Sequence, residues 1–370
     1  MAEFVFLIHP PEAADIARKS RLVKHLSGSF LEGILNKIPP MKVFTLNGVK
    51  FPGGEVSGHF VTVPLTAHQM FSLPEETIAR RIVQAGKRVE KLGADIVGLG
   101  FSPLLAEKAG AILRNHFGFA AISGNTFTVA AALEAVKKAA VMMGHNLESS
   151  KIVILGATQP LGMVCALEVA RDAKRMTLVG KEKRKLQELA GKIFFESGLS
   201  VSVTAETKGI IASADVVIVA DRMEEFNIEA REISAGAVVC ELAGPLCSKN
   251  SLAENRDDVL VIEGGMVELP SDVFFPFYRG FPQGHVSPAM AETMIMALEE
   301  QRKEPLLERP LSLESMRKIL VLAKNHGFRQ CGLKNRNGIL ISEEIEKIRI
   351  SKQKRMKVTV CSQYLDRIIS

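Results

Sequence analysis

The chain has 370 residues, of which 47% are apolar and 24% charged, so it is long enough for two domains, or three short ones, and too apolar to be disordered over most of its length. Its 29 Gly, 16 Pro and 5 Cys exclude a collagen-like chain and a disulfide-rich scaffold. The net charge of +6 comes mostly from residue 331 onward, where nine Lys and Arg accompany four Asp and Glu. The near-neutral remainder argues against a nucleic-acid-binding groove.

Three features predict a cytoplasmic protein. No run of about 18 apolar residues predicts a membrane-spanning helix, and the start of the chain, MAEFVFLIHPPEAAD, lacks the basic leader of a secretory signal. The five cysteines are odd in number and form no CxxC pair, which is typical of a reducing compartment. The eight histidines show no zinc-site spacing, so we expect no bound metal.

The first half of the chain alternates predicted strands and helices. Apolar runs at 4–8, 41–46 and 56–63 predict strands. Pro74 and the two glutamates after it predict the start of a helix, because proline suits the first turn and carboxylates favour the positive helix end. The apolar segment ADIVGLG predicts a further strand, buried on both faces of a sheet.

The alternation becomes regular from Lys151 onward. Strands are predicted at KIVILG, MTLVGK, VSVTAE, ADVVIVA, GAVVCELA and VLVIEGG. Helices are predicted after the first two of these strands, and two more at SPAMAETMIMALEEQ and SLESMRKILVLAKNHGF. Strands that alternate with helices predict an α/β fold with a Rossmann-type doubly wound parallel sheet.

A glycine-containing turn follows the first strand of this sheet. It consists of Gly156, Ala157, Thr158, Gln159, Pro160, Leu161 and Gly162. A helix that begins there offers free N–H groups and the positive end of its dipole to a pyrophosphate. Gly156 and Gly162 fit the first and third glycines of a dinucleotide-binding loop. Gln159 stands where the middle glycine would be, and Pro160 after it lacks an N–H, so the cradle is altered.

The second strand ends in basic residues. NAD-binding loops carry an acidic residue here, which binds the ribose hydroxyls, whereas this chain has Gly180 followed by Lys181, Lys183 and Arg184. Cations at this place suit a 2′-phosphate. A charged hydrogen bond contributes about 1.5–3 kcal/mol, which is enough to decide the preference for NADP(H) over NAD(H). We therefore predict NADP(H); the alternative is that these residues form a solvated helix start.

These motifs set the predicted domain layout. We expect an α/β substrate domain at 1–149, an NADP-binding Rossmann domain at 150–266, C-terminal helices at 267–330 that pack back on the substrate domain, and a basic tail at 331–370. Later strand ends add Ala220, Gly264 and Gly265 to the predicted cofactor contacts. We expect the active site in the cleft between the domains, beyond the carboxyl ends of the strands.

The chain resembles a known enzyme family over roughly residues 4–328. The segments that carry the resemblance are, in order, LIHPPEAADIAR, GLGFSPLLAE, SGNTFTVAAALEAV, VILGATQPLG, VIEGGMVEL, AMAETMIMALE and ILVLAKNHGF. They are similar to those of the fatty-aldehyde-forming acyl-[acyl carrier protein] reductases and their uncharacterised bacterial relatives. The resemblance implies an NADP-dependent oxidoreductase that takes a long-chain acyl group from an acyl carrier protein or acyl-CoA. A cysteine accepts the acyl group before hydride reduces it to an aldehyde.

This chain departs from the family at the nucleophile. The family's cysteine precedes the (F/M)AE(T/A)M stretch, and Ala289 occupies that position here. Alanine cannot form a thioester, so either the enzyme works differently, it has lost the reaction, or the alanine was introduced. Cys240 and Cys247, near the end of a predicted strand, are alternative nucleophiles, although a lone cysteine is usually a small packing residue, as we expect for Cys165.

A more distant resemblance is to the shikimate dehydrogenases. VTVPLT and SGNTFT are similar to the segments that supply their catalytic Lys and Asp, but Thr66 and Phe127 stand at those positions. A polyol site built on that pair is therefore absent. Phe127 favours an apolar substrate channel or is a packed core residue.

Other polar residues are candidates for the predicted cleft. They are Asn125, Thr126, Thr128, Ser102, His285 and Glu292. His285 is a candidate acid or base four residues before Ala289, or a loop histidine without a role. Glu292 is expected to serve the N-terminal dipole of its own helix.

Three functions remain open. The first is an acyl-thioester reductase, and the second is a catalytically altered or inactive homologue that binds nucleotide or acyl chains, as the partner of an active paralogue or of an aldehyde-processing protein. The third is a dehydrogenase of an unrelated small molecule. The basic tail suits an acidic partner or a membrane surface, or is a solvated terminal helix.

Overall fold

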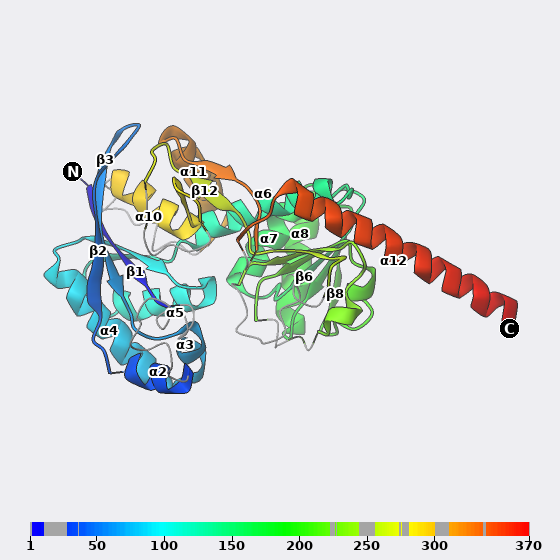
Figure 1. Ribbon diagram of the computed structural model, residues 1–370, viewed down its shortest axis with the longest axis horizontal. Helices are drawn as coiled ribbons and strands as arrows, with labels where there is room; N and C mark the ends of the chain where they lie inside the picture. Colours follow the sequence, from blue (N-terminus) through cyan, green and yellow to red (C-terminus); the bar gives the residue numbers. More distant parts are fainter. Residues whose placement is uncertain are drawn as a thin grey trace. The chain divides into compact units, whose positions relative to one another are not determined.

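The computed structural model describes residues 2–10, 28–35, 37–222, 226, 228–243, 256–273, 275, 281–299, 311–335 and 338–369. The chain forms two compact units (Figure 1). Unit 1 combines Met1–Thr128 with Val267–Tyr278 and Pro282–Arg329, and unit 2 combines Val129–Met266 with Arg279–Phe281 and Gln330–Ser370. The division falls at residue 128 rather than at 149, and the residues after 329 belong to unit 2.

Unit 1 is built on a five-stranded sheet with the order β2-β3-β1-β4-β5. The strands are β1 (Ala2–Ile8), β2 (Met41–Phe51), β3 (Gly54–Thr62), β4 (Ile96–Gly100) and β5 (Ala120–Ile122). β3, β1, β4 and β5 run parallel, and β2 is the antiparallel hairpin partner of β3. The strand predicted at 56–63 corresponds to β3, and ADIVGLG contains β4.

Alternate residues of β1 enter two apolar layers, because successive side chains of a strand point to opposite faces of the sheet. Val5 and Leu7 pack in a core that includes residues of α4 (Glu75–Lys91) and α5 (Pro103–Arg114). α10 (Pro288–Leu298) contacts β4 and β1. It approaches so closely that a Cβ at Gly98 would lie 2.0 Å from Thr293 Oγ1 and 2.6 Å from the Phe6 ring.

The remaining elements of unit 1 are short or connect its layers. They are α2 (Gly28–Leu35), α3 (Ala67–Ser72) and α11 (Leu313–Asn325). β12 (Met266–Glu268) pairs antiparallel with β13 (His285–Val286) in a small sheet that also holds β14 (Arg329–Cys331). α6 (Asn125–Met142) begins in unit 1 and continues in unit 2.

Unit 2 is a Rossmann-type doubly wound sheet, as predicted. Six parallel strands stand in the order β11-β10-β9-β6-β7-β8. They are β6 (Lys151–Leu155), β7 (Arg175–Val179), β8 (Ser202–Thr204), β9 (Val216–Val219), β10 (Val238–Glu241) and β11 (Leu260–Ile262), one for each predicted segment. The strand order reverses at β6, with β7 on one side and β9 on the other, and this reversal is where such sheets bind ligands.

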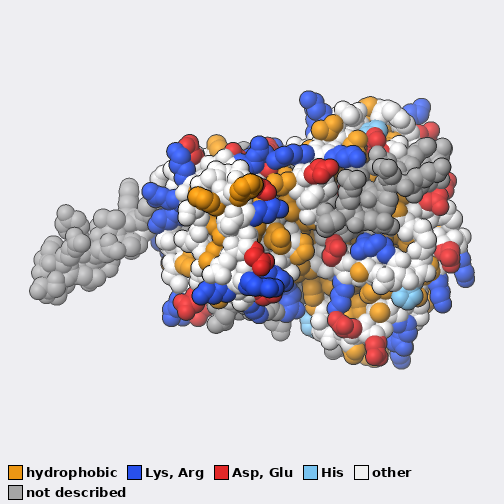
Figure 2. Space-filling view, turned by 180° about the vertical axis from the view of Figure 1, so that it is seen from behind, with side chains coloured by type: hydrophobic (Ala, Val, Ile, Leu, Met, Phe, Trp, Pro, Cys, Tyr) orange, Lys and Arg blue, Asp and Glu red, His pale blue; other side chains and the backbone are white. Residues whose placement is uncertain are grey.

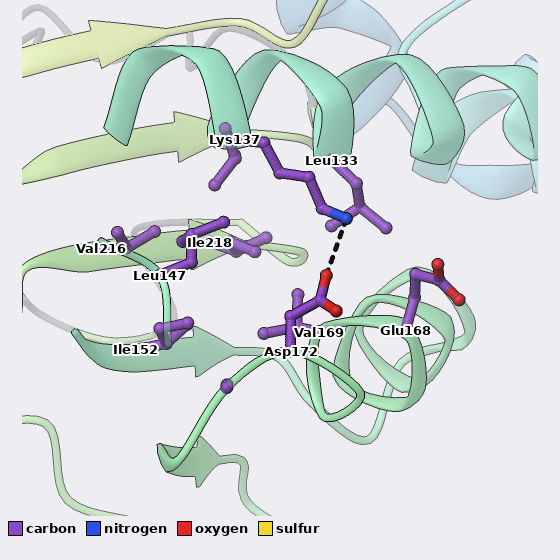
Figure 3. A pocket seen from close by; sticks show the side chains of 11 residues that line it. Leu133, Lys137, Leu147, Ile152, Glu168, Val169, Asp172, Val216 and Ile218 are labelled. Carbon is purple, nitrogen blue, oxygen red and sulfur yellow. Dashed lines mark hydrogen bonds and ion pairs between the residues drawn. The ribbon is translucent and has the colours of Figure 1, made fainter. Parts of the chain in front are cut away.

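Helices α6 and α7 (Pro160–Val169) lie over the same part of this sheet. A small cavity of about 20 Å³ lies between them, lined by apolar residues such as Leu133, Ile152 and Val169 (Figure 3). An ion pair between Lys137 and Asp172, at 2.8 Å, crosses its edge. The cavity holds about one water molecule and is a packing gap rather than a ligand site.

The other elements of unit 2 are α8 (Lys183–Ser197), two short 3₁₀ helices at Ile211–Ser213 and Ala230–Glu232, the hairpin of β15 (Lys334–Asn335) and β16 (Gly338–Ile339), and α12 (Ser342–Ile369). The predicted basic tail is therefore partly packed. Ile345 of α12 is buried, and Arg355 donates to Asp258 Oδ1 at 2.9 Å.

Charged side chains of both signs are interspersed over the face shown in Figure 2. This mixture agrees with the near-neutral charge of the chain before residue 331. No helix in the described part of the chain is long and apolar enough to cross a membrane.

Candidate functional site

The glycine loop after β6 has a backbone that other residues would not fit. Gly156 has a φ of +74°, and a Cβ there would lie 2.6 Å from the Asp221 side chain. A Cβ at Gly162 would lie 2.2 Å from the carbonyl oxygen of Gly156. The first glycine therefore permits the turn, and the second lets α7 approach the loop. The sequence assigned both roles to these positions.

The side chain of Gln159 links this loop to Asp221. The backbone of Gln159 caps α7, but its side chain makes no cap hydrogen bond and instead donates from Nε2 to Asp221 Oδ2 at 3.1 Å. Asp221 follows β9, and its Oδ1 accepts a hydrogen bond from Arg222 N at 2.8 Å. With Pro160 as the first helical residue, the N–H groups of Leu161 and Gly162 are the first that α7 presents, and helix geometry gives them no intrahelical acceptor.

The end of β7 presents cations beside the loop. The Thr158 side chain would lie 3.2 Å from a Cβ at Gly180, so the first loop packs closely on the second. Lys181, Lys183 and Arg184 are exposed around the start of α8. Arg184 Nε lies 3.6 Å from Glu188 Oε1, but its side chain is 86% exposed, and such a surface pair is weak.

The remaining predicted cofactor positions lie at the carboxyl ends of later strands. Ala220 follows β9 and donates from its N to Leu155 O at 2.9 Å. Gly264, with a φ of +82°, and Gly265 follow β11. A Cβ at Gly265 would lie 2.7 Å from Ala131 O, so α6 packs directly on this turn.

Cys240 is a core residue of β10. Its side chain is fully buried, and burial raises the pKa of its thiol to about 12. Burial also raises the pKa of Cys165. A thiol without access and without a thiolate at neutral pH is poorly suited to nucleophilic attack. Cys247 lies outside the described residues.

Ala289 occupies the first turn of α10 in unit 1. The hydroxyl of Ser287 caps this helix by accepting a hydrogen bond from Met290 N at 3.2 Å. A Cβ at Gly124 would lie 2.4 Å from both the Cα and the Cβ of Ala289, so the loop before α6 lies against this residue. Ala289 itself is half-buried.

Glu292 caps α6 rather than its own helix, contrary to the sequence-based expectation. Its Oε2 accepts a hydrogen bond from Phe127 N at 2.7 Å, in the first turn of α6. Burial raises the pKa of Glu292 to about 7, although the hydrogen bonds from Phe127 N and the Thr126 side chain oppose the rise. Glu292 lies one helical turn after Ala289, so a carboxyl group that exchanges its proton near neutral pH is close to that position in the chain.

The polar residues predicted for a cleft differ in their hydrogen bonding within unit 1. Asn125 donates from Nδ2 to Pro103 O at 3.2 Å, and Thr128 donates from Oγ1 to Gly124 O at 2.7 Å. Ser102 Oγ is buried and has no partner among the described residues. His285 is half-buried in β13, with Nδ1 2.9 Å from Gln283 O.

Thr66 and Phe127 have structural roles. Thr66 caps α3 in a capping box with Gln69 and donates from Oγ1 to Glu32 Oε1 at 3.0 Å. Phe127 is fully buried, which agrees with the packed-core interpretation rather than with a channel wall.

Sequence reasoning missed His9, which directly follows β1. Its Nδ1 lies 3.0 Å from Pro10 O, so Nδ1 carries the proton and Nε2 is left as an acceptor in the neutral ring. Burial lowers the pKa of His9, and its ring lies 5.6 Å from that of Phe101. Because β1, β4 and β5 are parallel neighbours, His9, Ser102 and Asn125 all follow strands at the same sheet edge. The sequence feature that could have identified His9 is a histidine placed directly after an apolar run that predicts a strand.

Some known proteins are similar to this chain at low sequence identity. No family model matches the chain. Aminotransferase PigE of Serratia sp. (strain ATCC 39006) is 23% identical over 279 residues, which are 75% of this chain and 32% of that protein. The chain thus spans about a third of the length of this curated relative.

Two solved structures illustrate the structural similarity. 5-Ketofructose reductase of Gluconobacter sp. strain CHM43 is 12% identical, with 87% of this chain and 98% of that chain covered and a TM-score of 0.36. Quinate dehydrogenase from Corynebacterium glutamicum, in complex with NAD, is 11% identical, with 65% and 79% covered and a TM-score of 0.30.

Proposed function

We propose that this chain is an NADP-dependent oxidoreductase whose unit 2 binds the dinucleotide at the Gly156–Gly162 loop. The observation that carries the proposal is the pair of glycines at the point where the strand order reverses, neither of which has room for a side chain. The N–H groups of Leu161 and Gly162 would hold the pyrophosphate at the positive end of α7. Lys181, Lys183 and Arg184 would hold the 2′-phosphate.

The bound nicotinamide would supply the hydride, and the protein would supply position and proton transfer. At the carboxyl edge of the sheet of unit 1, His9 offers a neutral imidazole whose Nε2 can accept a proton, and Glu292 offers a carboxyl group with a pKa of about 7. These are the kinds of group that general acid–base catalysis uses. We infer a carbonyl substrate, with an acyl thioester from acyl carrier protein or acyl-CoA as the first candidate.

A matched pair of glycine variants tests the cofactor site. Gly162→Ala places a methyl group 2.2 Å from Gly156 O and should abolish NADPH binding measured by fluorescence titration. Gly191→Ala, in α8, meets no atom within 4 Å and should leave it unchanged. NADPH binding by a folded Gly162→Ala variant with wild-type affinity would refute the proposed site.

A non-catalytic homologue that binds nucleotide or acyl chains is the second candidate. It is favoured by the alanine at position 289 and by the burial of Cys165 and Cys240. Incubation with NADPH and a series of acyl thioesters separates the two candidates, because only the reductase releases an aldehyde. Turnover of other carbonyl compounds, without aldehyde from any thioester, would instead indicate a dehydrogenase of a small molecule.

A further inference from the structure

A buried ion pair joins the end of β11 to the hairpin that precedes α12. Lys334 donates from Nζ to Glu263 Oε2 at 2.7 Å, and the backbone N–H of Glu263 donates to Lys334 O at 2.7 Å. Only 15% of the Lys334 side chain and 8% of the Glu263 side chain are exposed. The residues are 71 positions apart, so no local sequence pattern reveals the pair.

The pair lies beside an aromatic ring, and one oxygen of its carboxylate has no hydrogen-bond partner in the described part of the chain. Lys334 Nζ lies 5.5 Å from the centre of the Phe281 ring and 3.3 Å from Asn335 O. Glu263 Oε1 is buried and has no hydrogen-bond partner in the described part of the chain. Removing two charges from water is costly, and a buried pair is weak support for stability. A role in ligand binding therefore explains the buried pair better than a role in stability does.

The pair lies at the carboxyl end of β11, on the same edge of the sheet as the glycine loop that follows β6. Glu263 directly follows β11, and Gly264 and Gly265 come next in the chain. The phosphate loop follows β6, and the cations proposed for the ribose phosphate follow β7. A dinucleotide that crosses the reversal point therefore extends from there over the carboxyl ends of β9, β10 and β11, where its nicotinamide half belongs.

We propose that Lys334 and Glu263 flank the nicotinamide subsite and keep its local charge balanced. The inference rests on the proposed dinucleotide site of unit 2. The oxidised ring carries a positive charge that the reduced ring lacks. A neutral ion pair therefore discriminates little between the two redox states, whereas an uncompensated ammonium group would repel the oxidised ring. Glu263 acts as a positioning residue that fixes and neutralises Lys334.

Calorimetric titration with NADP⁺ and NADPH tests this charge balance. Glu263→Gln leaves the Lys334 charge uncompensated and should raise the Kd for NADP⁺ relative to that for NADPH by about threefold or more. Adding Lys334→Met to Glu263→Gln removes the charge and should restore the wild-type ratio. Lys137→Met breaks the ion pair with Asp172 elsewhere in unit 2 and should leave the ratio unchanged.

The controls separate failure of this inference from failure of the proposed function. 2′-Phospho-ADP-ribose lacks the nicotinamide and should bind the wild type and Glu263→Gln equally well. If it does not bind the wild type, the dinucleotide site is refuted and this inference with it. If it binds, an unchanged NADP⁺/NADPH ratio in Glu263→Gln, or a shifted ratio that persists in the double variant, overturns this inference alone.

A second variant covers the case in which Glu263→Gln does not fold. Lys334→Met alone leaves the Glu263 carboxylate uncompensated, which attracts the oxidised ring, so the Kd for NADP⁺ should fall relative to that for NADPH. An unchanged NADP⁺/NADPH ratio in a folded Lys334→Met variant would overturn the proposal.

Discussion

The side chain of Gln159 ties the glycine loop after β6 to Asp221, the second residue after β9, by a hydrogen bond of 3.1 Å from Nε2 to Oδ2. The bond crosses the point where the strand order reverses. It gives a partner to one oxygen of the Asp221 carboxylate, whose side chain lies against Gly156. Gln159 therefore has a role in this loop that a degraded glycine position would not have.

This hydrogen bond reverses the expected effect of Gln159→Gly. From the sequence, a glycine at this position should free the backbone and tighten NADPH binding. The structure predicts weaker binding, by about threefold to tenfold, because Asp221 loses its partner. Fluorescence titration of Gln159→Gly, Asp221→Asn and the double variant checks this. Tighter binding in Gln159→Gly would mean that Gln159 only hinders the approach of the pyrophosphate to the loop.

The cations after β7 predict a preference for NADPH over NADH. Replacing Lys181, Lys183 and Arg184 together by alanine should lower NADPH affinity about tenfold or more and leave NADH affinity nearly unchanged. Lys192→Ala, an exposed cation later in α8, serves as the control. Equal affinities of the wild type for the two cofactors would contradict the 2′-phosphate assignment.

The raised pKa of Glu292 predicts that the stability of the folded chain depends on pH. The Glu292 pKa of about 7 in the folded chain lies above the unfolded value of about 4.3, so the folded state binds the extra proton between these values. The free energy of unfolding should therefore fall as the pH rises from about 4.5 to 7, and the cost of the buried charge is complete above pH 7. Glu292→Gln cannot ionise, yet keeps an acceptor for Phe127 N.

Thermal unfolding at several pH values measures this effect. The Tm of Glu292→Gln should exceed that of the wild type by a few degrees at pH 8, and the difference should shrink toward pH 5. Thr126→Val removes a hydrogen bond that lowers the pKa of Glu292, so the loss of stability with rising pH should move to higher pH. A Tm difference that is the same at pH 5 and pH 8 would be inconsistent with a titrating Glu292.

Ala289→Cys tests the acyl-transfer resemblance. The variant places a thiol in the first turn of α10, where the helix dipole lowers its pKa. Mixing with an acyl thioester should then give an acyl-enzyme detectable by intact mass, whereas the wild type gives none at this position. Glu314→Cys places a thiol in the corresponding turn of α11 and controls for chemistry at any helix start.

Two results with these variants would count against an acyl site at position 289. An adduct on the wild-type chain would mean that another residue, such as Cys247, takes the acyl group. Equal acylation of the Ala289→Cys and Glu314→Cys variants, or no adduct on a folded Ala289→Cys variant, would mean that the position binds no acyl thioester. The non-catalytic candidate would then be preferred.

The sequence by itself determined the sheet of unit 2 and its glycine loop. Short apolar runs such as 152–155 and 216–219 are buried strands because nearly all of their side chains must leave water. Neither Gly156 nor Gly162 has room for a side chain, as a tight strand–turn–helix connection requires, whereas their contact with a cofactor stays a prediction. These features depend on neighbours within a few residues, which a sequence shows directly.

Only the tertiary structure decided which distant side chains meet. Glu292 caps the start of α6, 165 residues away, and Lys334 reaches Glu263 across 71 positions. Gln159 finds Asp221 only because β6 and β9 are neighbours in the sheet. Burial and pKa depend on all the atoms packed around a group. That is why the cap that Glu292 makes on α6, and its raised pKa, emerged only from the packed chain, whereas the local pattern gave no sign of them.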